Sequence, residues 1–156
     1  MAIYRIRNGQ SVARPPSVDL AVKLMWLGAA LELLGWMAGL LVVLGVLGAS
    51  SGGELFTTVE GVTMGVGGAI LSLIPALIAV GLWLLHAWAN GQGMNWARIT
   101  GTVLGVLAIV SSTFSLLSGV FVGVDVLTLV GHLVTIVLAA VIIWLMWRGE
   151  NRAFYA

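Results

Sequence analysis

Residues 24–49 read LMWLGAALELLGWMAGLLVVLGVLGA, and Glu32 is the only charged residue among them. A transmembrane helix needs roughly 20 mainly apolar residues to cross a hydrocarbon core of about 30 Å. This run is long enough, and it lacks the in–out alternation that is typical of a barrel strand. It therefore predicts a membrane-spanning helix.

Three further apolar runs follow, at residues 62–88, 99–124 and 126–147, and none of them contains Asp, Glu, Lys or Arg. We predict an all-α membrane protein with a four-transmembrane-helix bundle over residues 24–147. Residues 1–23 form an N-terminal arm and residues 148–156 a short tail. Pro75 is expected to kink the second helix, because it removes a backbone donor and crowds the preceding turn.

The composition supports a membrane protein and excludes several other classes. Hydrophobic residues make up 60% of the chain and charged residues 8%, whereas a soluble domain carries about 25% charged residues. The chain has no cysteine, which excludes disulfides and thiolate metal sites. A net charge of +1 gives no reason to expect nucleic-acid binding.

The charges predict the orientation of the four helices. The basic residues lie before the first run, between the second and third, and after the fourth: Arg5, Arg7, Arg14, Lys23, Arg98, Arg148 and Arg152. Acidic residues lie in the other two connections: Glu54, Glu60 and Asp125. Since basic loops stay in the cytoplasm, both termini are expected to be cytoplasmic. Ser17 is a candidate N-cap for the first helix, with Asp19 in its first turn.

Small residues recur at helical spacing in every run. Because helices in lipid gain dispersion contacts where small residues let backbones approach, these positions are expected to pack helices together. They include Gly28, Gly35, Gly39, Gly61, Gly65, Gly101 and Gly105. Packing within one subunit and a face for oligomerisation both fit this pattern.

Glu32 is the sharpest candidate for a functional residue. It follows Lys23 by nine residues, roughly 13 Å at the rise of an α-helix, which is too deep for a short side chain to reach the interface. It shares a helix face with Gly28, Gly35 and Gly39, so we expect it to point into the bundle. Glu32 is either a proton- or cation-responsive site or a neutral carboxylic acid hydrogen-bonded to a neighbour.

A second set of polar residues is expected at similar heights in the third and fourth helices. It consists of Ser111, Ser112, Ser115 and His132. Such a layer serves either as interhelical hydrogen-bonding contacts or as part of a proton relay. Chemistry beyond this is poorly supported, because the sequence shows no metal-ligand cluster, no nucleophile beside a base and no phosphate-binding loop. We therefore predict a protein that is not an enzyme and has no metal or cofactor.

Several interfacial motifs point to a family. They are Arg14-Pro-Pro-Ser-Val, Ala21-Val-Lys-Leu-Met-Trp-Leu-Gly-Ala-Ala, Ala87-Trp-Ala-Asn-Gly, Asn95-Trp-Ala-Arg-Ile99 and Trp147-Arg-Gly-Glu-Asn-Arg-Ala-Phe-Tyr155. Through them most of the chain resembles a family of small, uncharacterised four-span membrane proteins of actinobacteria. The resemblance implies a bacterial plasma membrane and specifies no activity.

A shorter resemblance concerns the first helix alone. The segment Gly28-Ala-Ala-Leu-Glu-Leu-Leu-Gly35 is similar to the first helix of small multidrug-resistance transporters, whose glutamate binds protons or cationic drugs. The long N-terminal arm and longer helices depart from that family.

Two functions follow as hypotheses. The first is a non-enzymatic membrane component that works through helix contacts, as an accessory subunit or as a self-assembling bundle. Its partners are the lipid bilayer and either further copies of itself or another membrane protein. The second is a small proton-coupled cation or drug transporter, or a channel, that uses Glu32.

Overall fold

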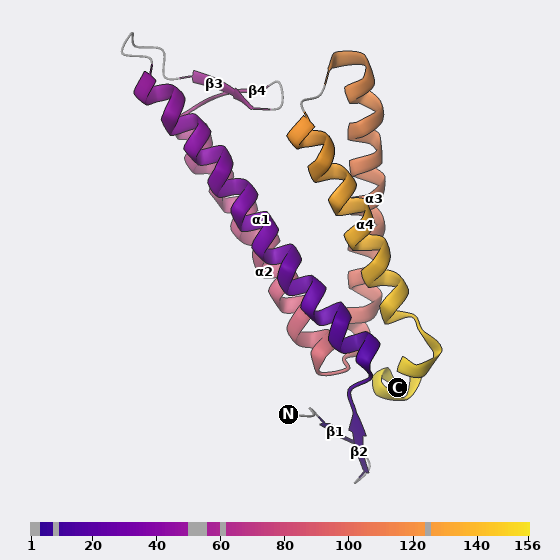
Figure 1. The fold of residues 1–156 in the computed structure, drawn as a ribbon. Helices are drawn as coiled ribbons and strands as arrows, with labels where there is room; N and C mark the ends of the chain where they lie inside the picture. The colour runs from indigo at the N-terminus through magenta and orange to yellow at the C-terminus, as the bar shows by residue number, and fades with distance from the viewer. Residues whose placement is uncertain (1–3, 8–9, 50–55, 60–61, 124–125) are drawn as a thin grey trace. The chain divides into compact units, whose positions relative to one another are not determined.

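The computed structural model describes residues 4–7, 10–49, 56–59, 62–123 and 126–156. Four long helices dominate it (Figure 1): α1 (Pro16–Ala49), α2 (Val66–Gly91), α3 (Asn95–Val122) and α4 (Val126–Met146). A 3-10 turn, η1 (Gly149–Asn151), and a short helix, α5 (Arg152–Tyr155), follow α4.

Within the described residues, four helical segments are long and apolar enough to cross a membrane. They are Pro16–Leu40, Leu73–Gly91, Asn95–Gly119 and Thr128–Met146. The prediction of a multi-pass, mainly helical protein with four membrane-spanning segments is thus confirmed by length and composition.

Two short antiparallel hairpins precede α1 and α2, and the sequence analysis did not predict them. β1 (Tyr4–Arg7) pairs with β2 (Gln10–Ala13), and β3 (Phe56–Val59) pairs with β4 (Val62–Gly65). The second helix accordingly starts at Val66, whereas the apolar run predicted a start at residue 62. Val62 and Thr63 are β-branched residues, which suit a strand at the start of this apolar run.

The first helix also starts at a different place than predicted. It begins at Pro16, before the apolar run, because proline favours the first position of a helix and lacks only an N–H that would be unpaired there. Asp19 lies in the first turn as expected. The N-cap predicted at Ser17 is wrong, since Ser17 is already inside the helix and its hydroxyl bonds to a distant residue.

A tight turn joins α2 to α3. Gly93 adopts φ +70°, the left-handed region that glycine enters without strain. Its N–H donates to Asn90 O at 2.9 Å, and the Met94 N–H donates to Ala89 O at 3.0 Å. This is the Schellman pattern of helix termination.

The chain divides into two compact units, which we describe separately. The first unit comprises Met1–Trp26 and Leu85–Ala156, and the second comprises Leu27–Leu84. In the first unit α3 and α4 form a helical hairpin (Figure 1). A Cβ at Gly105 would lie 2.9 Å from Ile143 Cδ1, so this glycine is a point of close approach between α3 and α4.

Burial in the first unit is concentrated at the end where α1 begins and α2 ends. Val18, Ala21, Ala87, Ala97 and Met146 are completely buried there. Along α3 and α4, in contrast, many large apolar side chains are exposed, such as Leu107, Phe114 and Val137. Apolar exposure of this extent suits helices whose outer surface faces lipid.

Candidate functional site

Polar side chains, four of them buried, gather at the same end of the first unit. They come from the start of α1, the end of α2, the start of α3 and the segment after α4, and we call this set the polar cluster: Arg14, Ser17, Asn90, Arg98, Trp147, Asn151 and Tyr155. A buried polar group has to be hydrogen-bonded to be tolerated. Each partner therefore helps to define the geometry of the cluster.

Asn151 connects the tail to two helices. It is completely buried, and its Oδ1 accepts a 2.7 Å hydrogen bond from the Ser17 hydroxyl on α1. Its amide Nδ2 donates to the backbone oxygens of Leu145 and Met146 at 2.7 and 3.2 Å. The last carbonyls of a helix have no hydrogen-bond donor within the helix. The Asn151 amide supplies that donor at the end of α4.

Asn90 is the second completely buried amide. Its Nδ2 donates to His86 O at 2.9 Å, one turn earlier in α2, and its Oδ1 accepts a 2.9 Å hydrogen bond from the Tyr155 hydroxyl. The end of α2 is thereby joined to α5. Tyr155 is itself buried, at 3% exposure.

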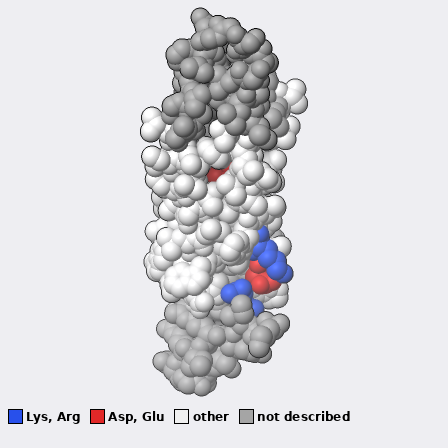
Figure 2. All heavy atoms as spheres, turned by 90° about the vertical axis from the view of Figure 1, so that its left-hand side faces the viewer, with Lys and Arg blue, Asp and Glu red and all other residues white. Residues whose placement is uncertain are grey.

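Arg14 fixes the chain just before α1. Its Nε and one terminal nitrogen donate to Gly91 O at 3.2 and 2.7 Å, and the other terminal nitrogen contacts Asp19 at 3.4 Å. Asp19 also pairs with Lys23 at 2.8 Å. Figure 2 shows Lys, Arg, Asp and Glu atoms gathered in the lower part of the described surface, the rest of which is almost uncharged.

Arg98 lies in the first turn of α3, between two aromatic rings. Its guanidinium carbon is 4.3 Å from the centre of the Trp147 ring and 4.9 Å from that of Tyr155. Its Nε is buried and has no hydrogen-bond partner among the described residues. Arg98 thus makes cation–π contacts, and its two terminal nitrogens, unlike the buried Nε, remain accessible as donors.

The environment of Tyr155 changes its acidity. Burial raises the pKa of this phenol from 10.0 to about 12, against the opposing effects of the nearby cations Arg98 and Arg14. Desolvation dominates because it disfavours the charged phenolate. The hydroxyl therefore stays protonated and can donate to Asn90 throughout the physiological range.

The sequence analysis did not single out any member of this cluster as a site residue. Asn90, Asn151 and Tyr155 do lie inside motifs that carry the family resemblance. Their role could not be deduced from those motifs, because the residues that pair are far apart in the chain. Asn90 and Tyr155 are 65 residues apart, and Ser17 and Asn151 are 134 apart.

Glu32, the principal candidate from the sequence, lies on α1 in the second unit and is exposed. Among the described residues it has no hydrogen-bond or ion-pair partner. The glycines of its helix face differ from one another. A Cβ at Gly28 would lie 3.0 Å from the Trp83 ring of α2, whereas at Gly35 and Gly39 it would meet nothing within 4 Å.

The predicted polar layer is placed on α3 and α4. Ser112 is buried, Ser115 and His132 are partly exposed, and the exposed Ser111 donates to Ala108 O at 3.1 Å within its own helix. No hydrogen bond links these serines to His132 in the described part of the chain. The structure thus places all four residues on the α3–α4 hairpin, but no described hydrogen bond joins the serines to His132.

The remaining glycines predicted to pack helices have different surroundings. Gly101 is close to His86, where a Cβ would lie 3.3 Å from the ring, and Gly105 is close to Ile143 as described above. Gly65 ends β4 and is not part of α2. Gly61 lies outside the described residues.

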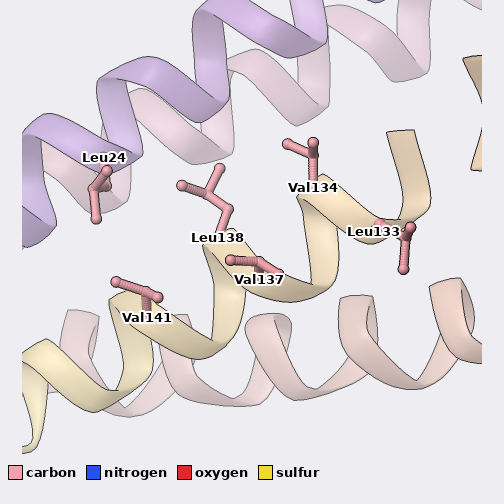
Figure 3. A pocket seen from close by; sticks show the side chains of 6 residues that line it. All are labelled: Leu24, Leu133, Val134, Val137, Leu138 and Val141. Atoms are coloured by element: carbon pink, nitrogen blue, oxygen red, sulfur yellow. The ribbon is translucent and has the colours of Figure 1, made fainter. Parts of the chain in front are cut away.

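An apolar groove of about 370 Å³ lies in the first unit, between the start of α1 and one face of α4 (Figure 3). Its lining consists only of leucine and valine: Leu24, Leu133, Val134, Val137, Leu138 and Val141. Such a lining can bind hydrocarbon but cannot orient or activate a polar substrate.

The described residues contain no group of three or more His, Asp or Glu side chains that could hold a metal ion. No family model, curated protein or solved structure matches the chain.

Proposed function

We propose that this chain is a non-enzymatic component of the membrane that works through helix contacts, either as an accessory subunit or as a self-assembling helical bundle. The contact face lies on α1 and is formed by Glu32, Gly35 and Gly39. We call it the α1 face.

One observation carries this proposal: the α1 face combines two glycines that have no neighbouring side chain against them with an exposed carboxyl group. In the second unit, a Cβ placed at Gly35 or Gly39 would have no described neighbour within 4 Å, so the backbone there is accessible to another helix. Glu32 lies one turn away and has no partner among the described residues. Small residues permit close approach, and the carboxyl group supplies a hydrogen-bonding group within the interface.

The membrane gives a reason for this face to be covered. A charged side chain near the centre of a bilayer costs about 2.5–3.5 kcal/mol on insertion scales. A partner helix that donates a hydrogen bond to Glu32 lowers this cost and at the same time fills the space beside Gly35 and Gly39. Association is thus favoured by both dispersion and polar pairing.

The location of the protein belongs to the same proposal. The distribution of the seven basic residues supports cytoplasmic N- and C-termini. The resemblance to a family of actinobacterial membrane proteins supports a bacterial plasma membrane.

A second function uses the same residue differently. An exposed, unpartnered carboxyl group within an apolar segment is also what a proton-coupled transporter of cations or drugs needs, because such a group can exchange protons and bind a cation. In this alternative Glu32 titrates during transport, whereas in helix association it only hydrogen-bonds.

Native mass spectrometry after gentle extraction from the protein's own membrane tests the first function. We expect a defined homo-oligomer or a fixed-ratio complex with another membrane protein. Replacing Gly35 and Gly39 together by leucine should dissociate it, because the larger side chains prevent close approach. Gly81→Leu is the matched control, since Gly81 on α2 is also exposed with nothing within 4 Å of a built Cβ.

Helix association through the α1 face is contradicted if the protein is a monomer without any partner. It is also contradicted if the Gly35/Gly39 double leucine variant assembles as well as Gly81→Leu. Glu32→Gln distinguishes the two functions, because glutamine keeps the hydrogen-bonding ability and cannot be ionised. Assembly that persists in this variant while liposome flux of protons or cations is lost supports transport. Absence of flux in the wild-type protein excludes it.

A further inference from the structure

Arg98 and Arg152 have no carboxylate partner among the described residues, and of the two only Arg98 has a buried nitrogen without a hydrogen-bond acceptor. Arg14 and Lys23 pair with Asp19, and Arg148 lies 3.8 Å from Glu150. Arg98 has no carboxylate partner and no hydrogen-bond acceptor among the described residues, although its Nε is buried. Its charge is therefore balanced by no protein anion in that part of the chain.

The two rings around Arg98 are held in place by hydrogen bonds. Trp147 Nε1 donates to Thr102 Oγ1 at 2.8 Å, and the same hydroxyl donates to the backbone oxygen of Arg98 at 2.7 Å. Tyr155 is held by its 2.9 Å hydrogen bond to the buried Asn90. The guanidinium therefore lies in a pre-organised aromatic setting and is not a freely moving surface side chain.

The geometry points to a site for the phosphate group of an anionic ligand at Arg98, with Trp147 and Tyr155 holding the guanidinium in position. Cation–π contacts engage the charge of the guanidinium but leave the N–H groups of its two terminal nitrogens to donate, since only Nε is buried. A guanidinium presents these donors as a planar fork that matches the oxygens of a phosphate.

The place of Arg98 in the chain favours phosphate over other anions. Arg98 lies at the start of the membrane-spanning segment Asn95–Gly119, and the half-exposed Trp147 directly follows α4. Tryptophan at the end of a span is typical of the headgroup level of a bilayer, where phosphate is the common anion. Two sources share this chemistry: the headgroup of an anionic phospholipid and a soluble phosphate compound.

Binding of phosphatidylglycerol to the purified full chain tests the site, with native mass spectrometry of mixed detergent–lipid micelles as the readout. We expect Arg98→Gln to weaken phosphatidylglycerol binding roughly tenfold, because a charge-assisted, two-point hydrogen bond is lost. Arg98→Lys keeps the charge but not the fork, so an intermediate loss is expected.

Arg152→Gln is the matched control. Arg152 is exposed on α5 and close in sequence to Tyr155, and its replacement removes the same charge. Equal weakening by Arg98→Gln and Arg152→Gln would show only general electrostatic attraction and would overturn the site. Trp147→Leu supplies a second variant that retains Arg98, and it should also weaken binding because it removes one side of the aromatic setting.

Inorganic phosphate and glycerol 3-phosphate distinguish the two sources. If either one binds in a manner that depends on Arg98 while phosphatidylglycerol binds all variants equally, the ligand is a soluble phosphate compound. If phosphatidylglycerol binding depends on Arg98 and these competitors do not displace it, the ligand is a lipid headgroup. If no probe shows dependence on Arg98, the proposal is wrong.

Discussion

The hydroxyl of Tyr155 donates a 2.9 Å hydrogen bond to the amide oxygen of Asn90, which is completely buried. This contact joins α5 to the end of α2 across 65 residues, and Tyr155 also forms one side of the aromatic setting of Arg98.

We expect Tyr155→Phe to lower the free energy of unfolding by about 1–3 kcal/mol, because the oxygen of Asn90 is left buried without a donor. Denaturant unfolding in detergent micelles, followed by tryptophan fluorescence, measures this change. Tyr4→Phe is the control, since Tyr4 is the only other tyrosine. Equal stability of the two variants would contradict the role assigned to this hydrogen bond.

The raised pKa of Tyr155 predicts how stability depends on pH. Between pH 10.0 and about 12 the unfolded chain releases the phenolic proton while the folded chain keeps it. The folded state then binds more protons, so the free energy of unfolding falls as pH rises through this window. In a Tyr4→Phe background, the ultraviolet absorbance of phenolate reports Tyr155 alone, and ionisation near pH 10 would contradict its burial.

Asn151 is expected to be more important for stability than its partner Ser17. Asn151→Ala removes three hydrogen bonds at a completely buried position, whereas Ser17→Ala removes one. We expect a loss of about 3 kcal/mol or more for Asn151→Ala and about 1–2 kcal/mol for Ser17→Ala. Chemical unfolding of both variants and of the double variant measures these losses. Since the two residues share one bond, the double variant should lose less than the sum.

Two glycines of α1 should respond differently to replacement by alanine. At Gly28 the added methyl group would lie 3.0 Å from three atoms of the rigid Trp83 ring, so we expect overpacking to cost about 1–3 kcal/mol. At Gly35 the methyl group would meet no described atom within 4 Å in the second unit, so we expect this variant to keep its stability. Thermal unfolding of both variants in the same detergent measures the difference in stability. If Gly28→Ala is as stable as Gly35→Ala, the prediction is wrong.

The absence of cysteine allows a direct test of orientation. Single cysteines at Gln92 and Ala153, both exposed positions, should react with a membrane-impermeant maleimide only after the cells are opened. A cysteine at Ser51, in the connection predicted to be external, should react in intact cells. If only the cysteines at Gln92 and Ala153 react in intact cells, the orientation is the reverse of the predicted one. Labelling of all three sites in intact cells would also contradict cytoplasmic termini.

The existence of four membrane-spanning helices could be predicted from the sequence because hydrophobicity is a property of each segment by itself. The ends of the helices were less predictable. Pro16 extends α1 into the polar arm, and β4 takes up Val62–Gly65 from the start of an apolar run. Both outcomes depend on local backbone preferences that a hydropathy pattern does not contain.

The candidate functional residues also include features that the sequence reveals and features that only the structure reveals. Glu32 could be found from the sequence because a charge within an apolar run is conspicuous wherever the helix packs. Its exposure and the open space at Gly35 and Gly39 could not be found, because repeating glycines look alike until a neighbour such as Trp83 lies against one of them.

The sequence by itself therefore determined the class of the protein, the number of its candidate membrane spans and the position of Glu32 within the first of them. Only the tertiary structure decided that Arg98 is held between Trp147 and Tyr155, and that Asn90 and Asn151 join α1, α2 and α4 to the tail. The physical reason is that hydropathy adds up along the chain. A hydrogen bond or a cation–π contact, in contrast, exists only when folding brings two distant groups to the right distance and orientation.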